Sequence, residues 1–230
     1  KAAHLLTFAP ILAAAIPEIA PTIGFDQRSP HHAYDIFTHT AHVTAAVPAE
    51  LALRWAALLH DIGKPAAFTT DETGRGHFYG HAKQSAEIAE GILRTLKAPT
   101  ALREEVIFLI SQHMTRLEAD KKLLRRRISR LGTDSIQKLL ALQEADMGSK
   151  GTGMPEEDPF DRIRQLLEEI RVENACLSLK DLAVNGHDLM ALGLSGKDIG
   201  NCLNTLLARV LDEELPNEKS ALLAEVRRIL

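Results

Sequence analysis

Residues 51–65 read LALRWAALLHDIGKP, and this stretch decides the fold. Its first nine residues are apolar apart from Arg54, and leucine and alanine dominate them. Such a composition favours a buried helix over a strand, because strands draw on β-branched and aromatic residues. The run ends abruptly at His60-Asp61, and burying an ionisable pair costs several kcal/mol unless something neutralises it.

Two interpretations of His60-Asp61 are open on these residues alone. A divalent cation would neutralise the pair, since neutral imidazole supplies nitrogen while carboxylate supplies oxygen and negative charge. In the alternative, His60 lies at the C-terminus of the helix, where a positive charge is favourable, and Asp61 is solvated.

The composition of the whole chain agrees with packed helices. Hydrophobic residues make up 45% and aromatic residues 4% of 230 residues. The net charge of −4 argues against a generic polyanion binder, so any nucleic-acid contact must use a local patch. Two cysteines, Cys176 and Cys202, are too few for a disulfide framework and favour a reducing cytoplasm.

No stretch approaches the length that spans a membrane. The apolar segment 1–16 is interrupted by Pro10 and carries one lysine or arginine, so its leucine and isoleucine spacing favours a packed helix pair over a signal peptide. The chain begins with Lys1, and we therefore expect it to be cut from something longer.

Apolar periodicity predicts helices along most of the chain. A glycine-, proline- and threonine-rich loop is expected over 65–80, and a linker over 148–153. A domain over 1–150 and a smaller helical extension over 151–230 follow, with possible RNA binding assigned to the extension. The predicted helices are 33–47, 49–59, 81–96, 100–113, 121–131, 134–147, 160–170 and 201–211.

Histidines are concentrated in the first half of the chain, where eight of ten fall between His31 and His113. Imidazole is the commonest nitrogen ligand of metals. His39 lies about twenty residues before His60, and Asp146 is expected at the end of a helix. These residues add a histidine and a carboxylate to His60-Asp61.

The spread of His39, His60-Asp61 and Asp146 over helices resembles the HD superfamily of metal-dependent phosphohydrolases. The resemblance implies an all-α helical bundle in which these four residues hold a divalent metal ion. It also implies hydrolysis of phosphate esters of nucleotides or RNA ends.

Several further motifs resemble bacterial tRNA nucleotidyltransferases of the CCA-adding or poly(A)-polymerase-like kind. They are 24–30, 60–65, 76–81, 176–182, 185–189 and 215–218, and so the resemblance covers nearly the whole chain. It departs in one respect, because the sequence has neither a Gly-Gly-Xaa-Val-Arg-Asp-type phosphate loop nor an Asp-Xaa-Asp metal pair. We therefore expect that this chain lacks the nucleotidyltransferase head and does not add nucleotides alone.

His81 and His113 resemble the two extra histidines with which some HD enzymes hold a second metal ion. They could equally bind substrate phosphate, because histidine serves either role. His77 lines the same mouth or is solvated. His31, His32 and His42 are expected at the surface or behind the ligands.

The ligand set suits Mn²⁺, Mg²⁺, Fe, Co, Ni or Zn, with one or two ions per chain. A bound ion activates water and draws charge from phosphoryl oxygens. Asp61 could bridge two metals or orient the attacking water. Lys64 could neutralise charge on the phosphate as a catalytic residue, or it could be an exposed lysine near a helix end.

A basic stretch over 121–130 carries six cations in ten positions. At helical spacing Lys122, Arg126 and Arg130 share one side. This side could meet RNA phosphates, or it could be a solvated face whose charges pair with acidic neighbours.

Two functions follow from these patterns. The first is a metal-dependent phosphohydrolase whose partners are nucleotide or RNA phosphate esters. The alternative is the non-catalytic body of a larger nucleotidyltransferase, which would hold tRNA. A regulatory HD protein that acts on free nucleotides is a third possibility.

Overall fold

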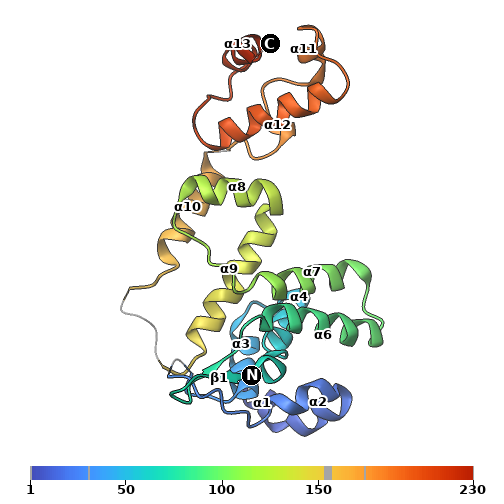
Figure 1. Ribbon diagram of the computed structural model, residues 1–230, viewed down its shortest axis with the longest axis vertical. Coiled ribbons are helices and arrows are strands. Elements are labelled where there is room, and N and C mark those ends of the chain that lie inside the picture. The colour runs from blue at the N-terminus through green and yellow to red at the C-terminus, as the bar shows by residue number, and fades with distance from the viewer. Residues whose placement is uncertain (1, 31, 153–156, 174, 230) are drawn as a thin grey trace. The chain divides into compact units, whose positions relative to one another are not determined.

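The computed structural model describes residues 2–30, 32–152, 157–173 and 175–229 (Figure 1). Thirteen α-helices and one two-stranded sheet are found in these ranges, so the all-α prediction is confirmed. His31 and the linker residue Gly153 lie outside the described residues. No helix in the described part of the chain is long and apolar enough to cross a membrane.

The chain divides into two compact units. The N-terminal unit comprises the described residues of 1–116 and 137–158, and the C-terminal unit those of 117–136 and 159–230. This division differs from a single boundary near residue 150. The reason is that helix α8 (Lys121–Leu131) packs against α10 (Asp161–Val172) and α12 (Lys197–Leu211).

Helices α3 (Ile36–Ala46), α4 (Leu51–Leu59), α6 (His81–Thr95) and α7 (Thr100–Gln112) form the centre of the N-terminal unit. Helix α4 packs against α3 and α7, and α6 packs against α7. The side chains buried between them include Ile36, Leu53, Leu59, Leu93, Leu109 and Ile110. Around this centre lie α1 (Ala2–Thr7), α2 (Ala9–Ala15), the 3₁₀ helix η1 (Pro17–Thr22) and most of α9 (Thr133–Gly148).

The predicted loop over 65–80 contains regular structure. It holds α5 (Lys64–Ala67) and a hairpin of β1 (Thr69–Thr70) and β2 (Gly76–His77). The Asp71 side chain closes the hairpin turn by accepting hydrogen bonds from the backbone N–H groups of Thr73 and Arg75. This side-chain turn is what an uninterrupted loop prediction missed.

The C-terminal unit has its own hydrophobic core, which includes Leu189, Leu206, Leu222 and Val226. Besides α8, α10 and α12 it contains the 3₁₀ helix η2 (Leu179–Asp181), α11 (Gly186–Met190) and α13 (Lys219–Ile229). The sequence patterns did not predict α13, although Leu222 and Val226 stand four positions apart on one buried face.

Candidate metal centre

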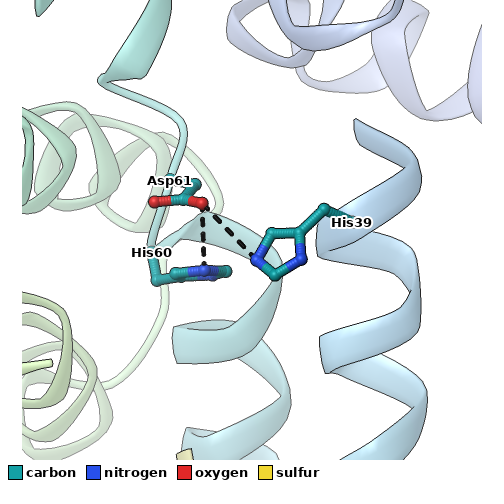
Figure 2. Close-up of side chains that lie close together, drawn as sticks. All are labelled: His39, His60 and Asp61. Atoms are coloured by element: carbon teal, nitrogen blue, oxygen red, sulfur yellow. Dashed lines mark ion pairs between the residues drawn. The ribbon is translucent and has the colours of Figure 1, made fainter. Parts of the chain in front are cut away.

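The N-terminal unit brings together all six predicted metal ligands from five helices. Four of them stand at helix ends, since His60 and Asp61 follow α4, His113 follows α7 and His81 begins α6. Figure 2 shows how His39 from α3 points toward this pair. The six side chains are those of His39, His60, Asp61, His81, His113 and Asp146.

One group of ligands surrounds the Oδ2 atom of Asp61. This atom lies 3.2 Å from Nε2 of His60 and 3.7 Å from Nε2 of His39. Oδ1 of Asp146 adds a second carboxylate oxygen, 2.9 Å from His39 Nε2 and 3.8 Å from His60 Nε2. Two histidines and two carboxylates therefore converge in the way that the resemblance implied.

A second group surrounds the other carboxylate oxygen of Asp61. Oδ1 lies 3.4 Å from Nε2 of His81 and 4.0 Å from Nε2 of His113. The two imidazole Nε2 atoms are 3.2 Å apart. Asp61 is thus shared by two sets of three residues whose ligand atoms are close enough to hold a metal ion.

Backbone carbonyls set the orientation of all four imidazole rings. In each ring Nδ1 faces a carbonyl oxygen and Nε2 faces the carboxylates, so Nδ1 carries the proton when the ring is neutral. The Nε2 lone pair is then directed to the centre. The contacts are His39 with Ser149 at 3.1 Å, His60 with Ala57 at 2.8 Å, His81 with Phe78 at 2.8 Å and His113 with Ile110 at 2.6 Å.

Nε2 of His60 is a buried polar atom that has no hydrogen-bond partner among the described residues, whereas Oδ2 of Asp61 has the Lys64 ammonium as an ion-pair partner at 2.8 Å. His39 and His60 are fully buried, and Asp61 is 2% exposed. A buried polar atom without a hydrogen-bond partner is costly, and a divalent cation would provide a partner for His60 Nε2 beside the charged Asp61 carboxylate. The donor set and its burial therefore fit a metal ion.

The electrostatics keep the carboxylates charged. Burial alone would raise the pKa of Asp61, but the neighbouring His60 and Lys64 hold the pKa of Asp61 well below its usual range. Burial also opposes the charged form of His60, yet Asp61 and Asp146 raise the pKa of His60. By contrast, burial followed by the charge of His60 lowers the pKa of His113 to about 4.

Lys64 is buried, which rules out the interpretation that it is an exposed lysine. Its ammonium lies 2.8 Å from Asp61 Oδ2 and donates a hydrogen bond to Gln27 Oε1 at 2.8 Å. It also lies 5.3 Å from the centre of the Phe78 ring. Gln27, for which the sequence suggested no role, therefore holds the one lysine that touches Asp61 among the described residues.

A close contact fixes the His60-Asp61 turn against α6. The N–H of Gly63 donates to Oγ of Ser85 at 2.9 Å. A Cβ atom at Gly63 would lie only 2.6 Å from the backbone nitrogen of Ser85. Glycine is required here for close approach, and this approach places Asp61 beside His81.

A cavity of about 280 Å³ opens onto the centre, and its wall combines charged side chains, histidines and aromatic rings. Asp61, Lys64, His81, His113 and Asp146 line it, together with His32, Gly76, His77, Phe78, Tyr79, Met114 and Lys150. The sequence did not single out Tyr79, Met114 or Lys150.

The remaining histidines lie apart from the ligand atoms. His77 is one of the residues that line the cavity, which agrees with the first of its two interpretations, and its Nε2 contacts Asp71. His32 packs edge-on against His39 with ring centres 5.2 Å apart, and burial together with Lys64 lowers the pKa of His32 to about 3. His42 stacks on Tyr34.

The basic stretch forms α8 in the C-terminal unit, where several of its cations are paired. Arg126 makes a bidentate contact with Asp212, in which Nε donates to Oδ1 at 2.6 Å. Arg125 contacts Glu173 at 2.8 Å and also Glu213. Lys122, Arg126 and Arg130 are exposed, while Leu124 and Ile128 are buried.

Comparisons with known proteins give a consistent result. A family model described as tRNA nucleotidyltransferase domain 2, putative, matches residues 67–226. The A-adding tRNA nucleotidyltransferase of Deinococcus radiodurans is 36% identical over 88% of this chain and 49% of its own length. The CC-adding tRNA nucleotidyltransferase of Thermus thermophilus is 34% identical over 89% of this chain and 47% of its own.

A shorter match covers a quarter of a third protein. The multifunctional CCA protein of Aromatoleum aromaticum is 37% identical over 44% of this chain and 25% of its own length. This chain spans about half the length of the two nucleotidyltransferases named above. The predicted resemblance to tRNA nucleotidyltransferases is therefore confirmed.

Proposed function

The chain belongs to the tRNA nucleotidyltransferase domain 2 family, and from that premise we propose that its N-terminal unit is a metal-dependent phosphohydrolase of the HD type. The substrates would be phosphate esters of nucleotides or RNA ends. The observation that carries the proposal is the sharing of Asp61 between two buried groups of ligand atoms. The two free cysteines suit a reducing cytoplasm as its location.

The side chains divide into holding and charge-balancing roles. His39, His60, Asp61 and Asp146 would hold the metal ion, and His81 and His113 would hold a second ion or the substrate phosphate. When bound, a divalent cation supplies Lewis-acid chemistry that activates water and withdraws charge from phosphoryl oxygens.

Lys64 is the residue that balances the charge of the reacting phosphate. Its ammonium sits on Asp61 and lines the cavity, so a phosphate in the cavity would meet a fixed positive charge. A preorganised charge of this kind stabilises negative charge that develops on the phosphoryl oxygens. Gln27 and the Phe78 ring keep the lysine in place.

Metal binding and hydrolysis assays test this function. The purified protein is titrated with Mn²⁺, Mg²⁺, Co²⁺, Ni²⁺ and Zn²⁺, and then assayed on bis-p-nitrophenyl phosphate and on nucleoside 2′,3′-cyclic phosphates. His60→Ala and Asp61→Ala should each lower turnover by more than about 100-fold, since loss of a ligand exceeds the effect of its supporting groups. His42→Ala serves as the matched control, because His42 stacks on Tyr34 outside the ligand groups. Metal-independent turnover, or none, would refute the proposal.

The second candidate function is to hold tRNA. It is favoured by the matches to two named tRNA nucleotidyltransferases, which cover most of this chain. Lys122, Arg126 and Arg130 on α8 are the proposed phosphate contacts. Salt-sensitive tRNA binding that survives Asp61→Ala but is lost on charge reversal at Arg126 and Arg130 would support it. No binding at low salt would remove it.

A further inference from the structure

Residues 77–79, which begin at the last residue of β2, form part of the cavity wall, and their side chains alternate between two environments. Phe78 packs against Phe68 and Phe25, with ring centres 5.4 Å and 6.5 Å away. His77 and Tyr79 instead stack on each other, with ring centres 5.3 Å apart and planes only 5° from parallel. An extended chain produces this separation, because successive side chains point to opposite sides.

The stacked rings of His77 and Tyr79 are held in a defined orientation. His77 Nε2 donates to Asp71 Oδ2 at 2.8 Å, which leaves Nδ1 as an acceptor. The Tyr79 hydroxyl donates to that Nδ1 at 3.3 Å. The Asp71 carboxylate is itself held in the hairpin turn, because it accepts hydrogen bonds from the backbone N–H groups of Thr73 and Arg75.

Most of the Tyr79 ring is nevertheless open to solvent, since the residue is 77% exposed. Met114, another residue of the cavity wall, is 61% exposed. Two large apolar side chains thus stand beside a polar centre that contains Asp61 and Lys64. Ligand sites commonly combine apolar and aromatic walls with a few polar groups in this manner.

We propose that Tyr79, supported by His77, stacks the base of a nucleotide whose phosphate lies at the candidate metal centre. This inference rests on the proposed function and narrows its substrate class to esters that carry a nucleobase. Any base offers a π-face, so the contact favours nucleotides without selecting among the four bases. A cavity of about 280 Å³ is small among ligand sites, which suits one nucleotide or RNA end rather than a duplex.

Binding of a matched ligand pair tests the inference. Adenosine 5′-monophosphate and ribose 5-phosphate share the sugar and phosphate, and only the first has a base. Each is titrated into the Mn²⁺-loaded protein by calorimetry, and released phosphate is assayed afterwards so that binding and turnover are recorded separately. The nucleotide should bind roughly 5- to 150-fold more tightly, which is the range expected for one stacked base.

Variants assign that difference to the tyrosine. Tyr79→Ala should remove the preference for the nucleotide and leave ribose 5-phosphate binding unchanged, whereas Tyr79→Phe should retain the preference. Phe8→Ala is the control for loss of an exposed aromatic ring, since Phe8 is 51% exposed and does not line the cavity.

Equal affinity for the two ligands, or a preference that persists in Tyr79→Ala, would overturn the inference. Absence of measurable binding of both ligands would overturn it as well. The proposed function has its own readout in these outcomes, because metal-dependent hydrolysis of bis-p-nitrophenyl phosphate does not require a nucleobase. If the wild-type protein does not hydrolyse bis-p-nitrophenyl phosphate, the proposed function is contradicted. If it does hydrolyse this ester but binds the two ligands equally, only the stacking role of Tyr79 is contradicted.

Discussion

At the scale of single residues, Asp61 has the largest part in the candidate centre. Its two oxygens face different histidines, Oδ2 toward His39 and His60 and Oδ1 toward His81 and His113. Substitution of a carboxylate that contacts both groups of candidate ligands should therefore weaken metal binding by both groups. Substitution of a histidine in one group should weaken metal binding by that group alone.

Asp61→Asn should therefore abolish tight metal binding, while His81→Ala should retain one ion on the His39 and His60 side. The amide keeps the shape of the carboxylate and removes its charge, on which hard divalent cations depend. Metal content after gel filtration, measured by mass spectrometry, checks both variants. If Asp61→Asn and the wild type hold equal amounts of metal, Asp61 is not a ligand.

The pH dependence of metal binding follows from His60. Its pKa is raised from 6.5, so the charged His60 stabilises the metal-free protein below that pH and this stabilisation is lost as the pH rises through the folded-state pKa. A metal ion requires neutral imidazole, so its binding displaces the proton at lower pH. His113, with a pKa of about 4, is already neutral and adds no change near neutrality.

Mn²⁺ should consequently raise the Tm more at about pH 8 than at about pH 6, as binding competes less with protons. Thermal unfolding with and without Mn²⁺ at the two pH values measures the difference. The opposite order, or equal shifts in Tm at both pH values, would contradict the assignment of His60 as a ligand.

The residues of the centre were predictable because their spread along the chain resembles the ligand pattern of the HD superfamily; the residues alone left two interpretations of His60-Asp61 open. His39, His60, Asp61 and Asp146 were all selected from the sequence, and the structure brings them together. Their supports were not predictable, because they are backbone groups such as the carbonyl of Ser149 or neutral side chains such as Gln27. Nothing in sequence spacing indicates which carbonyl a histidine ring will meet.

At the scale of elements, the contact between the His60-Asp61 turn and α6 makes a quantitative prediction. Gly63→Ala should lower the free energy of unfolding by about 1–3 kcal/mol, since the new methyl group meets backbone rather than a flexible side chain. It should also weaken metal binding, because the displaced turn separates Asp61 from His81. Urea denaturation and metal titration measure the two effects.

Gly91→Ala is the matched control for this substitution. Gly91 lies inside α6 with nothing within 4 Å of a built Cβ, so alanine there should stabilise the protein by about 0.5–1 kcal/mol. Metal affinity should stay unchanged. Equal behaviour of the two variants would show that the close approach at Gly63 is unimportant.

Helix α8 permits a test that separates RNA binding from structural pairing. Arg126 is bound by Asp212, and Asp212→Asn removes the partner charge while leaving the arginine. If Arg126 meets phosphate, Asp212→Asn should raise tRNA affinity severalfold, and Arg126→Ala should lower it and reduce the salt slope by about 0.9. Filter binding over a salt series measures both. If Asp212→Asn and Arg126→Ala lower tRNA affinity equally, the Arg126–Asp212 ion pair has only a structural role.

Helices were predicted better than the short elements between them. The range 121–131 is the range observed for α8, because a basic face and a buried face alternate at helical spacing. The β1–β2 hairpin was missed because its turn depends on the Asp71 side chain. Helix α11 was missed because its capping residue Asn185 stands in a glycine-punctuated stretch.

At the scale of the whole molecule, the two units carry different proposed tasks. The candidate metal ligands lie in the N-terminal unit and α8 lies in the C-terminal unit. A boundary near residue 150 could not reveal that 117–136 group with the later residues, because tertiary packing of α8 on α10 and α12 decides this. The linker composition marks only one of the places where the chain passes between units.

The tasks should be separable by mutation. Asp61→Ala should abolish metal-dependent hydrolysis and leave tRNA affinity within about twofold, since Asp61 and α8 belong to different compact units and share no partner residue. Charge reversal at Arg126 and Arg130 should abolish tRNA binding and leave metal-dependent hydrolysis unchanged. Parallel assays of hydrolysis and tRNA binding on both variants check this, and loss of both activities in either variant would refute separate tasks.

The central claim is that one buried centre built around Asp61 binds divalent metal. Anomalous diffraction from crystals grown with Mn²⁺, recorded on both sides of its absorption edge, tests it most directly. The account predicts an anomalous peak about 2.0–2.3 Å from His60 Nε2 and from Asp61 Oδ2, as for metal–nitrogen and metal–oxygen bonds. Well-ordered His39, His60, Asp61 and Asp146 side chains with no anomalous peak between them would contradict it.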